Sequence, residues 1–157
     1  MRRKEREVTD ITKIKAIIGK CFSIHIGFND DGHVYVVPVN FGCKEENGKY
    51  TFYFHGARDG RKYGLIQKGG LVGFELDCNN SILKADTACA HSAFYSSVIG
   101  EGNVSEITDN DDKKTALNLI MKQATGRGDW NYPSVMLNRV GVFKIDVTEL
   151  SCKEHLM

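Results

Sequence analysis

Hydrophobic and polar residues alternate along most of this chain, and a period of two predicts β-strands. Over residues 21–28 the pattern predicts a half-buried strand whose inward side chains are Phe22, Ile24, Ile26 and Phe28. The segment 33–42 is apolar on both faces, so we expect both of its faces to be covered. Further strands are predicted over 49–56, 71–77, 91–107 and 139–150, with a less regular stretch over 78–90.

Helical spacing of apolar residues is confined to a few short segments. Helices are predicted over 11–20, over 59–68, after Thr108 or Asp109, and as a single turn over 134–138. Asp10 suits the N-cap of the first helix. Most strands are joined by tight turns, so they should be antiparallel. We therefore expect a mainly β protein, a single β-barrel with peripheral helices, in one domain spanning 1–157.

Composition and charge exclude several classes of function. The formal net charge is +1, which gives no general attraction for nucleic acid. The chain has neither the run of ~20 apolar residues that a membrane helix requires nor an apolar stretch typical of a signal peptide. Its five cysteines include no CxxC pair, so we expect no disulfide framework and no metal site. These features predict a soluble cytoplasmic protein.

The segment FHGARDGRKYGL (54–65) concentrates positive charge where a predicted strand passes into a helix. Basic side chains such as Arg61 and Lys62 are unfavourable at the positive end of a helix, unless an anion offsets them. Gly56 and Gly60 allow the backbone to approach a ligand closely. The segment is either a phosphate site or an ordinary solvated basic face.

Two further features of the sequence suggest a ligand with a flat, polar ring. Pro38, within YVVPVNFG (35–42), cannot donate to a ladder and belongs on an edge strand or at a bulge. A loop, a subunit partner, an irregular barrel closure or a planar heterocycle could meet the free backbone beside it. His55 ends a strand on the face of Thr51 and Tyr53, where it suits a ligand contact, a proton donor or a strand end.

The remaining candidate residues carry weaker signals. Tyr95, Ser96 and Ser97 precede a glycine and are either ligand contacts or ordinary strand residues. Trp130, in the loop before Pro133, offers a ring for stacking on an aromatic ligand or for anchoring the loop. The chain lacks a dinucleotide fingerprint, a P-loop, an HExxH motif and a GxSxG motif.

Taken together, the motifs resemble those of the flavin-binding split-barrel proteins related to pyridoxamine phosphate oxidase. Within that group the similarity is strongest to the nitroimidazole-resistance (Nim-type) proteins. The matching segments are RRKEREVTD (2–10), YVVPVNFG (35–42), YFHGARDGRK (53–62), VGFELD (72–77), YSSVIGEG (95–102), a helix after TDNDDKK (108–114), and W-x-x-P at Trp130 to Pro133. The order and spacing of these short motifs make the resemblance specific.

The resemblance implies a six-stranded antiparallel split barrel that works as a homodimer, with FMN in the clefts between subunits. It implies that backbone groups of Val37, Pro38, Val39 and Asn40 line the flavin ring. The other implied cofactor contacts, along the ribityl chain, the phosphate and the cleft wall, are His55, Gly56, Ala57, Arg61, Lys62, Tyr95, Ser97, Val98 and, from the second subunit, Trp130.

The activity implied by the resemblance is transfer of hydride from reduced FMN to a small aromatic compound, with a nitroimidazole as the Nim-type substrate. His55 is the candidate catalytic residue, as a proton donor. A nicotinamide cofactor is a candidate reductant. The family also implies two alternatives, a pyridoxamine 5'-phosphate oxidase-like enzyme and a non-catalytic flavin- or haem-binding protein.

Overall fold

The computed structural model describes residues 3–156, so Arg2, which begins the first matching motif, and Met157 lie outside the described residues. The strands are β1 (Glu7–Val8), β2 (Ile24–Asp30), β3 (His33–Val39), β4 (Gly42–Glu46), β5 (Lys49–Gly56), β6 (Leu71–Leu83), β7 (Ser92–Ile107) and β8 (Gly141–His155). The helices are α1 (Ile11–Lys20), α2 (Gly60–Lys68), α3 (Asn110–Thr125) and α4 (Ser134–Arg139), with single 3-10 turns at Lys4–Arg6 and Ala88–Ala90.

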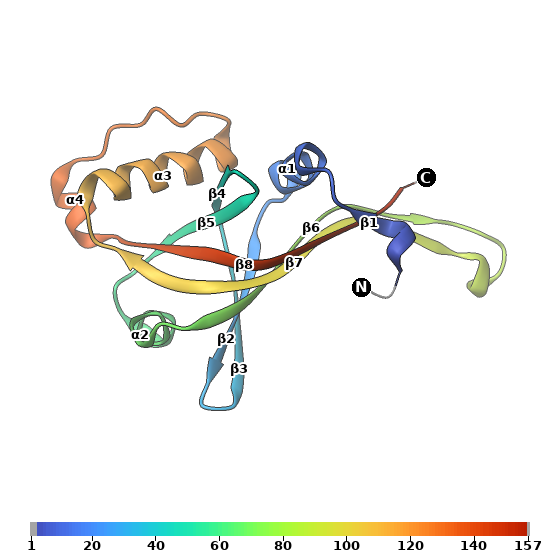
Figure 1. Ribbon diagram of the computed structural model, residues 1–157, viewed down its shortest axis with the longest axis horizontal. Helices are drawn as coiled ribbons and strands as arrows, with labels where there is room; N and C mark the ends of the chain where they lie inside the picture. Colours follow the sequence, from blue (N-terminus) through green and yellow to red (C-terminus); the bar gives the residue numbers. More distant parts are fainter. Residues whose placement is uncertain (1–2, 157) are drawn as a thin grey trace.

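All strands join one curved antiparallel sheet in the order β3-β2-β6-β7-β8-β5-β4, and β1 pairs with β8. The prediction of a mainly β, antiparallel protein is confirmed, but the hydrogen-bonded ladder does not close between β3 and β4. In Figure 1 α1, α3 and α4 lie to one side of the long β7–β8 pair, and α2 lies toward the β2–β3 hairpin. The helices are therefore peripheral, as expected.

The core forms because the strands alternate as their sequences predict. Phe52 and Phe54 of β5 are fully buried, whereas Thr51, Tyr53 and His55 point to the opposite face. Helix α1 begins where its cap predicts, since the Asp10 carboxylate accepts a hydrogen bond from the backbone N–H of Lys13 at 2.7 Å. The helix buries Ile14, Ile17 and Ile18 against the same core.

The structure corrects three details of the predicted strands. Phe22 is 83% exposed, because β2 begins only at Ile24 and Phe22 precedes the pleat. Val34 is 82% exposed, so β3 is covered on one face rather than two. Residues 3–156 form eight strands instead of the six predicted from the sequence, because β1 and β4 were not predicted. β6 also continues to Leu83, through part of the stretch expected to be irregular.

Two glycines allow β7 and β8 to cross closely at a β-bulge. The register between these strands shifts at Glu101 and Gly102. A Cβ atom at Gly100 would lie only 2.1 Å from the carbonyl oxygen of Glu149. Any side chain at Gly100 therefore forces these two backbones apart.

Neither a membrane-spanning helix nor a cluster of metal-binding side chains is found in residues 3–156. No helix there combines the length and apolar character needed to cross a bilayer. No group of three or more His, Cys, Asp and Glu side chains in this range is arranged to hold a metal ion.

Candidate functional site

The basic segment picked out in the sequence lies where β5 turns into α2. The turn is possible because Gly60 adopts a φ of +77°. Asp59 is the N-cap of α2, but its side chain makes no capping hydrogen bond. The first backbone N–H groups of α2 are therefore left without a side-chain acceptor, which is the condition under which a helix N-terminus binds an anion.

Lys62 lies over this turn and contacts the end of β5. Its ammonium nitrogen is 2.8 Å from the position that a Cβ atom would occupy at Gly56, so a side chain there would displace the ammonium from this position. Burial lowers the pKa of Lys62 from its ordinary value. Lys62 forms no ion pair within residues 3–156, so its charge is available to an anion.

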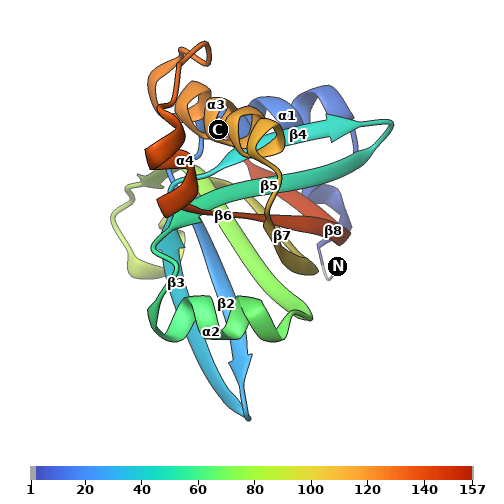
Figure 2. The same ribbon diagram turned by 90° about the vertical axis from the view of Figure 1, so that its left-hand side faces the viewer.

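The two neighbouring arginines are already engaged. The Nε of Arg61 lies 2.8 Å from an Asp30 carboxylate oxygen, and the guanidinium stacks 4.4 Å from the centre of the Tyr35 ring. These contacts hold the first turn of α2 against the β2–β3 hairpin. Figure 2 shows α2 beside these two strands. Arg58 points elsewhere and pairs with Glu106 at 2.9 Å.

Strand β3 is an edge strand, and Pro38 lies on it where its missing N–H predicts. It stands opposite His25 of β2, and no strand pairs with the other side of β3 within the described residues. Val37 and Val39 pack partly against the core, while Pro38 points outward. The side-chain amide of Asn40 donates a hydrogen bond to the carbonyl oxygen of Phe22 at 3.4 Å.

His55 opens onto an apolar cavity of about 230 Å³ between β5, α3 and α4. Its other lining residues are Leu117, Ile120, Met121, Tyr132, Met136, Leu137 and Val140. His55 is exposed to solvent, but the protein around the imidazole partly desolvates it. This desolvation, with the positive charge of Lys62, lowers the pKa of His55 below its ordinary value, which favours a neutral imidazole at pH 7.

The sequence did not predict this cavity. Part of its wall could be inferred, because Leu117, Ile120 and Met121 recur at helical spacing in the helix predicted after Asp109. The wall depends on α4, which is held in place by a buried lysine. The ammonium of Lys113 donates to the carbonyl oxygens of Leu137 at 3.1 Å and Val140 at 3.4 Å. These bonds satisfy carbonyls at the C-terminal end of α4, where a positive charge is also favoured by the helix dipole.

The predicted site residues fall into two groups that lie on different parts of the sheet. The first group lies around α2 and the free edge of β3, and comprises Val37, Pro38, Val39, Asn40, His55, Gly56, Ala57, Arg61 and Lys62. Tyr95, Ser97 and Val98 lie far from His55 along β7, although the row of Pro38 continues through His25 and Glu75 to Ile99, beside Val98. His55 is across β8 from Ile107, and at ~3.3 Å per residue Tyr95 is about 40 Å further along the same strand.

Within the second group, only two of the three side chains can face a ligand. Val98 is fully buried in the core, so its backbone alone is available. Tyr95 and Ser97 are partly buried on the opposite face of the sheet.

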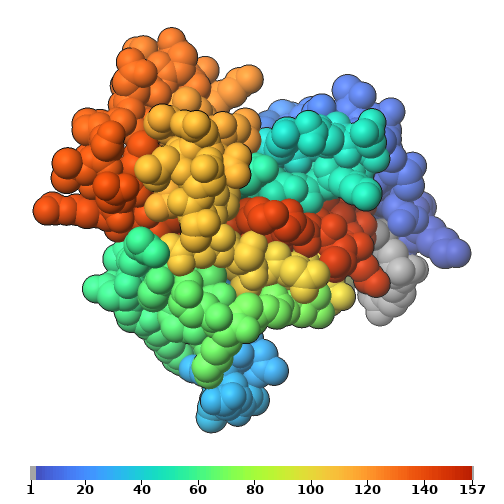
Figure 3. Space-filling view, turned by 60° about the vertical axis from the view of Figure 1, so that its left-hand side comes forward, coloured from blue at the N-terminus to red at the C-terminus, as the bar shows by residue number. Residues whose placement is uncertain are grey.

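Trp130 lies apart from both groups, in the loop between α3 and α4. Its indole N–H donates to the carbonyl oxygen of Arg127 at 3.0 Å, and the Arg127 guanidinium lies 4.4 Å above the ring. Its backbone N–H donates to the side chain of Asn118. Figure 3 shows the loop and helices of this region (orange) as a block separate from α2 (green). In this chain Trp130 therefore serves as a loop anchor that retains 37% exposure.

Solved structures with the same fold cover almost the whole chain. A candidate 5-nitroimidazole antibiotic resistance protein from Bacteroides thetaiotaomicron VPI-5482 superposes with a TM-score of 0.79 at 28% identity, over 94% of this chain and 85% of that one. The flavocytochrome Anf3 from Azotobacter vinelandii (TM-score 0.79, 19% identity, 100% and 72% coverage) shares the fold. So does the FAD and heme binding protein from Mycobacterium smegmatis (TM-score 0.81, 15% identity, 97% and 74% coverage).

The sequence itself gives the family. No curated protein matches the chain significantly. The family model described as pyridoxamine 5'-phosphate oxidase matches residues 10–154. This range includes β2 to β7, β8 up to its last residue but one, all four helices and both groups of candidate residues. The fold is thus the split barrel expected from the motifs, and the chain belongs to the pyridoxamine 5'-phosphate oxidase family.

Proposed function

We propose that this protein is an FMN-dependent oxidoreductase that reduces a small aromatic compound, with nitroaromatic molecules of the nitroimidazole type as its substrate class. The observation that carries the proposal is the position of Lys62. Its partly buried ammonium meets an uncapped helix N-terminus over Gly56, beside the free edge of β3. An anionic tail and a flat polar ring on one molecule match these two neighbouring features.

The phosphate of FMN would bind at the start of α2. Lys62 and the first-turn N–H groups would hold it, and Gly56 leaves space for that contact. Arg61 would add only its terminal nitrogens, because its Nε is engaged by Asp30. We therefore expect Lys62 to contribute more to FMN binding than Arg61.

The ring of FMN would lie along the edge of β3. Backbone groups of Val37, Val39 and Asn40 are the candidate partners for its polar edge. A bound flavin supplies hydride transfer, and the protein supplies binding and orientation.

The cavity beside His55 suits a small, uncharged aromatic substrate. Its other lining residues are apolar apart from the Tyr132 hydroxyl, which lies 3.0 Å from the Asn118 side-chain oxygen, and they exclude water. A neutral His55 can donate or accept a hydrogen bond at the open edge of this cavity, and it would deliver a proton only after taking one up. No lysine or arginine lines it, which disfavours pyridoxamine 5'-phosphate, a substrate that needs a second anion site.

A homodimer would complete the site. Tyr95 lies about 40 Å and Ser97 about 33 Å along β7 from the row of His55, so a second subunit would bring them to the phosphate end of the same FMN. Trp130 would approach from that subunit as well. We place the protein in the cytoplasm, where its five free cysteines fit a reducing compartment.

The absorption spectrum of the purified protein tests the cofactor. We expect a yellow protein with about one FMN per chain, identified by chromatography of the released flavin against FMN and FAD standards. By loss of a charge-assisted contact, Lys62→Gln should weaken FMN binding about 10- to 100-fold. The matched control is Lys68→Gln, at the exposed far end of the same helix. A colourless protein that takes up no added FMN would refute the proposal.

Enzyme assays test the substrate class. Stopped-flow reduction by a nicotinamide donor, followed by reoxidation with metronidazole, should give turnover, whereas pyridoxamine 5'-phosphate should release no hydrogen peroxide. A non-catalytic flavin or haem carrier is the second candidate, because two neighbours of the same fold are a flavocytochrome and a FAD and heme binding protein. A Soret band after addition of haem, without turnover, would favour that alternative.

A further inference from the structure

One side of β8 is left without a strand neighbour in the middle of the strand. Along its other side β8 pairs with β7 almost continuously. On the open side, β5 pairs with β8 only as far as Asp146, and β1 pairs with Lys153 and Cys152. Within residues 3–156, no strand pairs with 147–151 on this side. At ~3.3 Å per residue, the unpaired edge is about 16 Å long.

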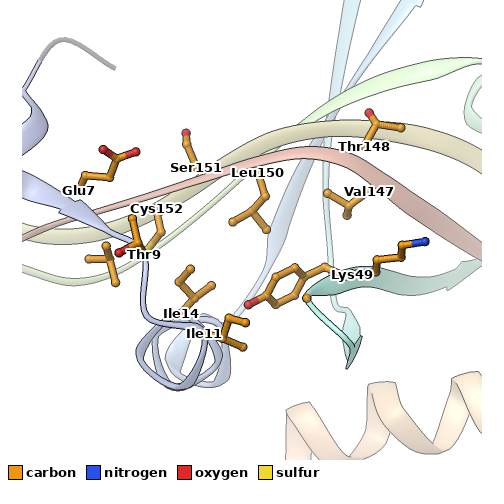
Figure 4. Close-up of a pocket in the computed structure, with 13 residues that line it drawn as sticks. Glu7, Thr9, Ile11, Ile14, Lys49, Val147, Thr148, Leu150, Ser151 and Cys152 are labelled. Carbon is orange, nitrogen blue, oxygen red and sulfur yellow. The ribbon is translucent and has the colours of Figure 1, made fainter.

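A cavity of about 580 Å³ lies over this unpaired edge. We call it the β8 groove; it is lined by Glu7, Val8, Thr9, Ile11, Ile14, Gly48, Lys49, Tyr50, Val147, Thr148, Leu150, Ser151 and Cys152. Figure 4 shows that Leu150 points toward Ile14 of α1, whereas the hydroxyls of Ser151 and Thr148 point the opposite way. An extended chain with apolar and polar residues in alternation matches these two sides.

A buried hydroxyl in the β8 groove lacks a partner. Tyr50 is only 6% exposed, and its phenolic oxygen makes no hydrogen bond within the described residues. Buried hydroxyls normally have a hydrogen-bond partner, and a buried donor without one is unfavourable. A carbonyl oxygen of an occupant would accept this hydrogen bond. The Tyr50 hydroxyl is therefore an observation independent of the unpaired strand edge, and both indicate a ligand with backbone-like polar groups.

The neighbouring strands fix the direction of such an occupant. Both β1 and β5 are antiparallel to β8, so a strand added between them would run in their shared direction. Its amino end would lie near Val8 and its carboxyl end near Lys49. The charges of the groove suit this direction. Glu7 lies at the end that would meet the positive amino terminus, and Lys49 lies at the end that would meet the negative carboxyl terminus.

We propose that the β8 groove binds an extended peptide segment of about five residues as an added antiparallel strand between β1 and β5. Its apolar side chains would alternate with polar ones, its amino end would face Glu7, and its carboxyl end would face Lys49. The β8 groove is separate from the proposed FMN site at α2 and β3, and the peptide proposal does not depend on the proposed oxidoreductase activity.

The probe is the pentapeptide Thr-Val-Thr-Val-Thr with free ends, added to the full-length protein as purified. Hydrogen exchange should show protection of 147–151 at a peptide concentration of ~1 mM, which detects even weak binding. Methylation of alternate peptide nitrogens removes the ladder donors and should weaken binding at least ~10-fold, or 1.4 kcal/mol. Acetylating and amidating the ends should also weaken it.

Variants separate this site from a merely structural cavity. Tyr50→Phe should leave the free protein at least as stable, because it removes an unsatisfied hydroxyl, and should weaken peptide binding. Lys49→Glu should weaken binding of the free-ended peptide, whereas Lys20→Glu, outside the β8 groove, should not.

Three outcomes would overturn the proposal. The first is the absence of protection of 147–151 at ~1 mM peptide. The second is equal binding of the N-methylated peptide, which would indicate an apolar ligand instead of a strand. The third is protection that grows with protein concentration without peptide, which would identify a second copy of this chain as the occupant.

Discussion

Replacing Lys113 with methionine should destabilise the protein through the wall of the His55 cavity. The Lys113 side chain is 3% exposed, and its ammonium holds two carbonyls at the end of α4. A hydrogen bond from a charged donor contributes about 1.5–3 kcal/mol, and a buried carbonyl left without a donor costs ~1–3 kcal/mol. Methionine keeps much of the apolar stem in place, so we expect a net loss of about 3 kcal/mol from the free energy of unfolding.

Thermal and urea unfolding of the purified proteins measure this loss. For a chain of this size, 3 kcal/mol corresponds to a fall in Tm of about 6–12 °C. The matched control is Lys114→Met, which removes only an exposed pair with Asp111 at 2.9 Å and should change stability by under ~0.5 kcal/mol. Lys113→Met should also weaken the binding of aromatic ligands in the His55 cavity. Equal stabilities of the two variants would refute the role assigned to Lys113.

Three further predictions concern the close strand crossing, the histidine and the exposed thiol. Gly100→Ala should lower the free energy of unfolding, measured in urea, by more than ~3 kcal/mol, because its Cβ meets the backbone of Glu149. The control Gly19→Ala, whose Cβ has nothing within 4 Å, should be neutral or stabilising. Similar free energies of unfolding for the two variants would contradict the bulge geometry. Burial lowers the pKa of His55 from 6.5, so on acidification the unfolded chain takes up this proton before the folded protein does. Lowering the pH from about 7.5 to about 5 should therefore reduce the free energy of unfolding of the wild type more than that of His55→Gln. Equal pH dependence of the two proteins would exclude a lowered pKa of His55. Ellman's reagent should label about one of the five thiols quickly, and Cys89→Ser should abolish that fast phase, since Cys89 alone among the cysteines is exposed.

Local patterns predicted most of the elements. The Asp10 cap and the isoleucine spacing placed α1 correctly, and the alternation in β5 correctly placed His55 on the face of Thr51 and Tyr53. Both inferences depend on neighbours within a few residues in sequence. The position of Pro38 on an edge strand was likewise predictable, because a missing N–H excludes it from the middle of a ladder.

Features that depend on distant residues were not predictable in this way. Phe22 continues an apolar alternation, but only the pairing of β2 decides where the pleat begins. β4 is mostly polar, and it is positioned by contact of Gly42 with α3, nearly 80 residues later. The engagement of Arg61 by Asp30 also requires the folded hairpin. The candidate phosphate site at the start of α2 was therefore predictable from the sequence, but the different contacts of Arg61 and Lys62 were not.

The pairing of β8 has a consequence for the order of folding. This strand is the last of the eight in sequence, yet it joins strands from the beginning and middle of the chain, including Thr51 opposite Asp146, 95 positions away. Such high contact order slows folding toward the millisecond-to-second range, because long loops close before their contacts form. Until β8 is in place, the edges of β1, β5 and β7 are all available for pairing with other chains. Newly made protein should therefore be most prone to aggregation before β8 docks, a vulnerability that the finished sheet conceals.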